Sequence, residues 1–108
     1  MKITNDRSEL DEVLDDPTSV VLILYGPKGQ AVHDLATKGA QPWRKIVLIE
    51  DLAKLTSEET SQWALTSDSY IVLKKDKSVS SRGALSQFYD QAGILELRKI
   101  NSALSKVE

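Results

Sequence analysis

Two runs of consecutive apolar residues dominate the first half of the chain. Val20–Tyr25 and Ile46–Ile49 carry an apolar side chain at every position, without alternating polar residues. A strand has this pattern when both of its faces are buried, as in a sheet covered by helices on both sides. The sequence therefore predicts two central strands at these positions.

Helical spacing appears before the first of these runs. Leu10, Val13 and Leu14 fall at positions i, i+3 and i+4, which places them on one face of a helix. The preceding Ser8–Asp11 has the form Ser-x-x-Asp, which is typical of a helix N-terminus. We expect this helix to end before Pro17, because the residue preceding a proline avoids the helical conformation.

Two further helices are predicted in the middle of the chain. Apolar residues between Ala31 and Ala36 recur at helical spacing, and Gly39 is a suitable helix stop. Thr56–Glu59 has the form of a capping box, which predicts a helix running through Trp63 and Leu65. Trp63 is expected in the core because of its size and its place on that helix.

The second half of the chain predicts a hairpin and a helical tail. Tyr70–Leu73 and Ser78–Ser81 read as strands on either side of a polar turn. From Leu85 onward the pattern is helical in two pieces, separated at Gly93. The last piece has one apolar face, which consists of Leu97, Ile100, Leu104 and Val107.

With a short strand at Met1–Thr4, the element order becomes βαβαβαββα. The helices between the first three strands imply parallel crossovers, and the last two strands form an antiparallel hairpin. We therefore expect an α/β fold with a mixed central sheet and helices on both faces. Because the chain of 108 residues has no repeat or linker, residues 1–108 are expected to form one domain.

Composition excludes several chemistries. Fourteen basic against sixteen acidic residues give a net charge of −2, which argues against nucleic-acid binding. The longest apolar run has six residues and the N-terminus lacks an apolar signal-peptide segment, so we expect no membrane span and a cytoplasmic location. The chain has no cysteine, which excludes disulfides, catalysis by its own thiols and cysteine-ligated metals.

The segment Ile23–Val32 resembles the active-site region of thioredoxins. That family carries a buried strand ending in Asp-Phe-Trp-Ala, then Pro-Trp-Cys-Gly-Pro-Cys, then a helix; here Tyr25 stands at an aromatic position and Pro27 at a proline position. Tyr70–Asp76 is similar to the family's strand and hairpin turn, and Gly83–Ser86 to the segment that opens its last helix. Together with the element order, the resemblance implies a thioredoxin-like fold over nearly the whole chain.

The departures from the family pattern concern its redox chemistry. Gly29 and Val32 occupy the positions of the two cysteines, and Ile23 occupies the position of the buried aspartate. Ser69 lies near the position of the family's cis-proline, so we expect a trans peptide bond there. The resemblance therefore implies a redox-inactive member of the family, not an oxidoreductase.

A groove beside the former active-site loop is what the family resemblance implies for function. It would be formed by Tyr25–Gln30, Thr66–Tyr70 and Gly83–Ala84, where backbone groups can hold an extended peptide. We expect a non-catalytic protein-binding or scaffold module, without cofactor or metal, whose partner is another protein. The expected binding residues are Tyr25, Pro27, Lys28, Gly29, Gln30 and Ser69, with Trp43 as a separate interface candidate.

An alternative function is the binding of a small ligand or anion, possibly by an enzyme. The loop Gly26–Gln30 precedes a helix, where backbone N–H groups and the helix dipole favour anions, and Lys28 adds positive charge. A tight turn between strand and helix also accounts for this loop. Self-association through a sheet edge or the C-terminal helix also stays open.

The remaining polar candidates are expected to be structural. His33, the single histidine, is predicted to be a solvated helix residue. The acidic pairs are expected on solvated faces and at helix N-termini, because no cation-binding loop spacing accompanies them; they are Asp11–Glu12, Asp15–Asp16, Glu50–Asp51 and Glu58–Glu59.

Overall fold

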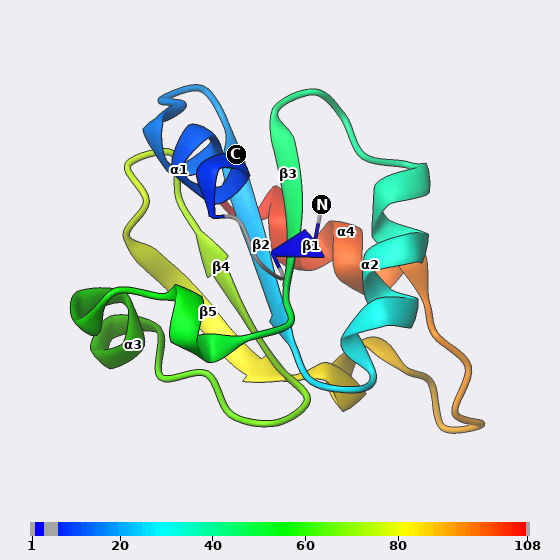
Figure 1. Cartoon of the computed structure of the whole chain (residues 1–108). Coiled ribbons are helices and arrows are strands. Elements are labelled where there is room, and N and C mark those ends of the chain that lie inside the picture. Colours follow the sequence, from blue (N-terminus) through cyan, green and yellow to red (C-terminus); the bar gives the residue numbers. More distant parts are fainter. Residues whose placement is uncertain (1, 4–6, 108) are drawn as a thin grey trace.

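Helices and strands alternate along the chain in the computed structural model, which describes residues 2–3 and 7–107 (Figure 1). The elements are β1 (Lys2–Ile3), α1 (Ser8–Asp15), β2 (Val20–Tyr25), α2 (Gly29–Lys38), β3 (Arg44–Ile49), α3 (Ser57–Trp63), β4 (Ser69–Leu73), β5 (Val79–Ala84) and α4 (Leu97–Ser105). Two 3-10 turns, η1 (Leu52–Lys54) and η2 (Leu85–Phe88), complete them. The predicted element order is confirmed; Met1 and Thr4 of the predicted first strand lie outside the described residues.

The strands form one mixed sheet in the order β1-β3-β2-β4-β5. β1, β3 and β2 run parallel, whereas β4 pairs antiparallel with β2 and β5 pairs antiparallel with β4. This arrangement confirms the α/β prediction of parallel crossovers followed by a hairpin. β3 begins at Arg44, earlier than its apolar run, because Arg44 and Lys45 continue the pairing with β2.

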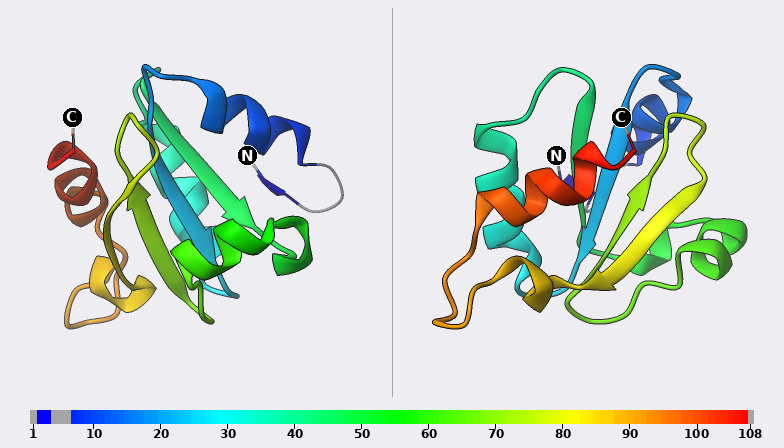
Figure 2. Two further views of the ribbon diagram at one scale, coloured as in Figure 1. Left: turned by 90° about the vertical axis from the view of Figure 1, so that its left-hand side faces the viewer. Right: turned by 180° about the vertical axis from the view of Figure 1, so that it is seen from behind.

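Helices cover both faces of the sheet, and each face has its own apolar core (Figure 2). Leu22 and Leu24 of β2 point into the core beneath α2, η2 and α4. Val21 and Ile23 point into the core beneath α1 and α3. Because alternate side chains of a strand point to opposite faces, a strand covered on both sides must be apolar throughout, as β2 is.

Local sequence signals account for most element boundaries. The capping box before α3 is confirmed, since the Glu59 amide donates to Thr56 Oγ1 at 3.1 Å and the Thr56 amide donates to Glu59 Oε1 at 2.9 Å. α1 ends at Asp15, before Pro17, and α2 ends before Gly39. Trp63 is buried as predicted, with 3% of its surface exposed.

The start of α1 differs from the predicted cap. The helix begins at Ser8, so the N-cap position is Arg7, whose side chain makes no capping bond. Instead, the Arg7 guanidinium binds Asp11 and Glu59, and it donates to the Lys54 carbonyl at 2.7 Å. These bonds connect the beginning of α1 to α3.

The predicted helical tail is shorter than its pattern suggested. η2 is a single 3-10 turn, and the chain then forms a loop in which Tyr89 bridges to Leu95. Asp90 Oδ1 accepts the amides of Ala92 and Ile94 at 2.8 and 2.9 Å, which holds a turn instead of a helix. α4 therefore begins at Leu97, and its face buries Ile100 and Leu104 while Val107 lies beyond its end.

Within the described residues every peptide bond is trans, including the bond before Ser69. No helix in residues 2–3 and 7–107 is long and apolar enough to cross a membrane.

Candidate functional site

The carboxyl ends of β2 and β3 leave an uncovered crevice between them. β2 continues into α2 on one face of the sheet, whereas β3 continues through η1 into α3 on the opposite face (Figures 1 and 2). Two neighbouring parallel strands whose connections leave toward opposite faces form a topological switch point, where open α/β sheets bind their ligands. The sheet topology thus places a candidate site at this edge.

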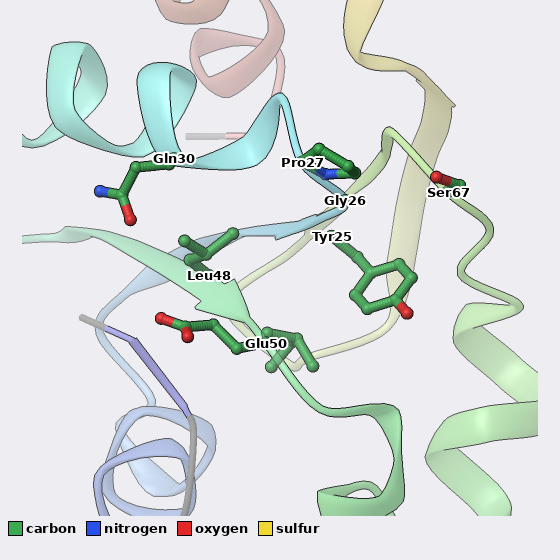
Figure 3. A pocket seen from close by; sticks show the side chains of 8 residues that line it. Tyr25, Gly26, Pro27, Gln30, Leu48, Glu50 and Ser67 are labelled. Carbon is green, nitrogen blue, oxygen red and sulfur yellow. The ribbon is translucent and has the colours of Figure 1, made fainter.

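A cavity of about 360 Å³ occupies this position (Figure 3). We call it the strand-end cleft, and it is lined by Tyr25, Gly26, Pro27, Gln30, Leu48, Ile49, Glu50 and Ser67. Its volume falls within the range of roughly 300–1,000 Å³ that is typical of ligand pockets.

A close approach of two loops shapes the wall of the cleft. Gly26 has φ +120, and a side chain at this position would lie 2.2 Å from the Asp68 amide nitrogen, so glycine is required there. Asp68 Oδ1 accepts the Lys28 amide at 2.9 Å, which fastens the loop after β2 to the loop before β4. The two segments that the family resemblance implied do therefore lie side by side.

The same hydrogen bond weakens the case for an anion site at the start of α2. The Asp68 carboxylate already accepts the amide of Lys28, and the Gly29 amide donates to the Gly26 carbonyl at 2.9 Å. Two of the N–H groups at the start of α2 that could meet an anion are therefore already used within the chain. In addition, no lysine, arginine or histidine from residues 7–107 lines the cleft. The geometry thus favours a ligand other than an anion.

The sequence-predicted site residues are only partly brought together. Tyr25, Pro27 and Gln30 line the cleft, whereas Lys28 is exposed outside its lining. Gly29 is buried beneath the loop, where a Cβ atom would lie 2.6 Å from Leu48 Cδ1. Ser69 lies on the far side of the loop in a smaller depression of about 160 Å³, together with Trp63, Tyr70 and Arg82. Tyr25 and Ser69 thus line two different depressions, and Lys28 lines neither of them.

The backbone near Ser69 is also less available than expected. Ser69 Oγ accepts the Thr66 amide at 3.0 Å and donates to the Thr66 carbonyl. The Asp68 carbonyl accepts the Leu85 amide at 2.8 Å. The N–H and O–H donors of these bonds are therefore already used within the chain, and only the second lone pairs of the carbonyl oxygens are left for an extended peptide.

Sequence reasoning missed the contribution of β3 to the site. Leu48, Ile49 and Glu50 supply one wall, and Ser67 comes from the loop before β4. The position of Glu50 gave a usable signal, because it directly follows an all-apolar strand and ligands bind at the carboxyl ends of such strands. Ser67 was not among the expected binding residues, although it lies in the segment Thr66–Tyr70 that the family resemblance placed at the groove.

Hydrogen-bond acceptors face the cleft from two of its walls. Gln30 Nε2 donates to Asp34 Oδ1 at 2.8 Å, and a carboxylate can accept only from the nitrogen of the amide. Figure 3 shows the Gln30 oxygen turned toward the side on which Glu50 lies. The Glu50 carboxylate makes no hydrogen bond or ion pair with residues 7–107. Both acceptors are thus placed to receive donors from a bound molecule.

Backbone strain accompanies the loop between the two depressions. Ala64 and Asp68 have positive φ angles of 46° and 55°. Residues other than glycine rarely adopt this conformation, and where they do they often lie near functional sites. The strained pair flanks Ser67, which supports the cleft as the functional region.

Candidates away from the cleft lie in different settings. His33 is 8% exposed, so the prediction of a solvated residue is wrong; α2 turns it inward, beside Asp34 at 3.3 Å. Trp43 is 44% exposed, next to the start of β3, and therefore at the opposite end of that strand from the cleft.

Among residues 2–3 and 7–107, no group of three or more acidic, histidine or cysteine side chains could hold a metal ion.

No protein-family model matches the chain, and a search of curated proteins finds no significant match.

Proposed function

We propose that the chain is a non-catalytic, redox-inactive binding module with a thioredoxin-like fold, and that it binds another protein through the strand-end cleft. The element order implied by the thioredoxin resemblance, βαβαβαββα, is the order of the folded chain, and this supports the fold assignment. Gly29 and Val32 at the cysteine positions cannot carry thiol chemistry, which supports a binding role.

The observation that carries this proposal is an open cleft at the topological switch point. Pro27, Glu50 and Ser67 are exposed residues of its lining, so its mouth is continuous with the protein surface. The ring of Tyr25 is half-buried against the core beneath α1 and α3, which makes it a rigid contact surface. A partially buried tyrosine at the edge of a pocket is a frequent anchor in protein interfaces.

Site-specific photocrosslinking tests this proposal. A photoreactive amino acid introduced at Ser67 should crosslink one defined partner in cells of the native host, and mass spectrometry should identify it. The matched control carries the same amino acid at Lys106, which lies beyond α4 and far along the chain from the cleft residues. Loss of crosslinks at Ser67, or identical products from both positions, would contradict the proposed site.

A small ligand in the same cleft is the second candidate function. The cleft volume of about 360 Å³ favours a small ligand, because it lies within the range of small-molecule pockets. We also propose that the protein is located in the cytoplasm. Imaging of a fluorescent fusion in host cells tests this location.

A further inference from the structure

We propose that the strand-end cleft binds the cationic side chain of a lysine or arginine from the partner protein. This inference rests on the proposed function and specifies the chemistry of its site. It follows from the charge of the lining residues, the orientation of their acceptors and the apolar surface between them.

The charge that residues 7–107 bring to the lining is negative. Among these residues Glu50 is the one carboxylate of the lining, and no basic side chain lines the cleft. The ammonium of a lysine and the guanidinium of an arginine present donors without any acceptor, which is what an acceptor-lined site requires. Hydrogen bonds between a cation and a carboxylate are roughly twice as strong as neutral ones.

A second acceptor strengthens the preference for a donor. Because Gln30 Nε2 is held by Asp34, the amide cannot rotate to present its N–H groups without losing that bond. With this bond in place its oxygen lies on the cleft side, turned toward the side on which Glu50 lies (Figure 3). An anionic or purely accepting ligand would meet oxygen atoms at both of these side chains.

The apolar lining suits the methylene stem of a basic side chain. Pro27 and Leu48 provide apolar surface on two walls, and the Tyr25 ring stands beside them. Lysine and arginine bury their stems on apolar surface while the charged group contacts polar partners.

The open mouth of the cleft and the net charge of the chain both suit a cation that is carried by a partner protein. An exposed rim at Pro27, Glu50 and Ser67 leaves room for the backbone that carries an inserted side chain. The chain carries a net charge of −2, so a basic segment is attracted over longer distances as well. A partner segment with an accessible lysine or arginine fits both features.

Nuclear magnetic resonance titration with blocked pentapeptides tests the chemistry directly. Each peptide carries one central residue between pairs of glycines, and the central residue is arginine, lysine, norleucine or glutamate. We expect the arginine and lysine peptides to shift the amide resonances of Gly26, Gln30, Glu50 and Ser67. Their affinity should exceed that of the norleucine peptide by about 10-fold, the effect of one charge-assisted hydrogen bond.

Charge variants provide the matched controls. Glu50→Gln keeps the shape of the side chain and should abolish the roughly 10-fold preference for the cationic peptides. Glu9→Gln, at an exposed position of α1, should leave it unchanged. Lys28→Glu should tighten binding of the cationic peptides by about 2-fold at low salt, because it removes a positive charge near the mouth, whereas Lys106→Glu should not.

The outcomes separate this inference from the proposed function. If the norleucine or glutamate peptide shifts the cleft amides at the same affinity as the lysine peptide, the cleft binds proteins but the cation assignment is wrong. If n-butylammonium or methylguanidinium alone binds as tightly as the peptides, the site takes small organic cations and the partner side chain is wrong as the source. If no probe shifts these amides, the inference is overturned, and crosslinking from Ser67 then decides the proposed function separately.

Discussion

Ile23 lies at the centre of the sheet, between Val47 of β3 and Ile71 of β4, with none of its surface exposed. It occupies the position at which the family resemblance implies an aspartate. Its neighbours in the core beneath α1 and α3 are apolar, so a carboxylate here would have no partner in this core. Isoleucine at this position therefore agrees with the redox-inactive module proposed above.

Substitution Ile23→Asp should destabilise the protein by about 3–5 kcal/mol, because it buries an unpaired carboxyl group and removes apolar contacts. Chemical denaturation at neutral pH measures this as a lower midpoint at an unchanged slope. Ile23→Val, which deletes one methylene, should cost about 1 kcal/mol. An unaltered midpoint for Ile23→Asp would mean that β2 does not occupy the centre of the sheet.

Ala64 ends α3 in the left-handed conformation, with φ 46° and ψ 45°. Glycine is the preferred residue at such a helix end, because it has no Cβ atom to clash with the backbone. Ala64→Gly should therefore raise the free energy of unfolding by about 0.5–1 kcal/mol, after allowance for the greater entropy of unfolded glycine.

The control for this substitution has the opposite expected sign. Ala31 is exposed within α2, where glycine should lower the free energy of unfolding by about 1 kcal/mol. Thermal unfolding of both variants measures the difference. Equal destabilisation by the two glycines would show that Ala64 is not strained.

At the scale of elements, Arg7 connects α1 to α3. Its guanidinium donates to both carboxylate oxygens of Glu59, at 2.8 and 3.0 Å, and Glu59 also closes the capping box of α3. The hydrogen bond from Arg7 lowers the pKa of Glu59 despite the opposing effect of burial. The two helices that cover one face of the sheet are thus joined by a charged contact at their N-terminal ends.

Stability should depend on pH through this contact. Because the folded protein holds the Glu59 pKa below its unfolded value, the stabilisation is complete above the unfolded pKa and is lost as pH falls through the folded pKa. Arg7→Gln should lower the free energy of unfolding by about 1–3 kcal/mol at neutral pH. The difference between the two proteins should shrink as pH falls below about 4.

Denaturant unfolding at a series of pH values measures this difference. Arg98→Gln is the control, because Arg98 pairs with Glu96 on the surface and its side chain is 80% exposed. That variant should unfold like the original chain at every pH. An effect of Arg7→Gln that stays constant between neutral pH and strong acid would contradict the assigned role of Glu59.

At the scale of the whole molecule, the absence of cysteine sets the redox behaviour. Thiol–disulfide exchange requires a thiolate as nucleophile, and no residue of this chain can supply one. The purified protein should therefore reduce insulin disulfides no faster than buffer containing the same reductant. Thioredoxin serves as the positive control, and activity that copurifies with the chain through two chromatographic steps would contradict the proposed function.

Local signals in the sequence were enough to predict several elements of the fold. Six apolar positions in succession specify a strand buried on both faces, and the side chain of Thr56 and that of Glu59 specify where α3 begins. A capping box works as a signal because its hydrogen bonds join residues that are three positions apart. A strand pattern works because successive side chains point to opposite faces of the sheet. The element order followed from them, and with it the mixed sheet.

The residues that line the cleft come together through contacts between distant segments of the chain. Tyr25 and Glu50 meet because β2 and β3 are paired in register, and Asp68 reaches Lys28 across 40 positions of the chain. The Asp68 carboxylate binds at the start of α2, where the sequence predicted a possible anion site. The Lys28 side chain lies outside the lining of the cleft. A glycine loop alone carries no information about which distant side chain will satisfy its amides. The register of the sheet supplies that information, and so the charge of the site could be determined only in the folded molecule.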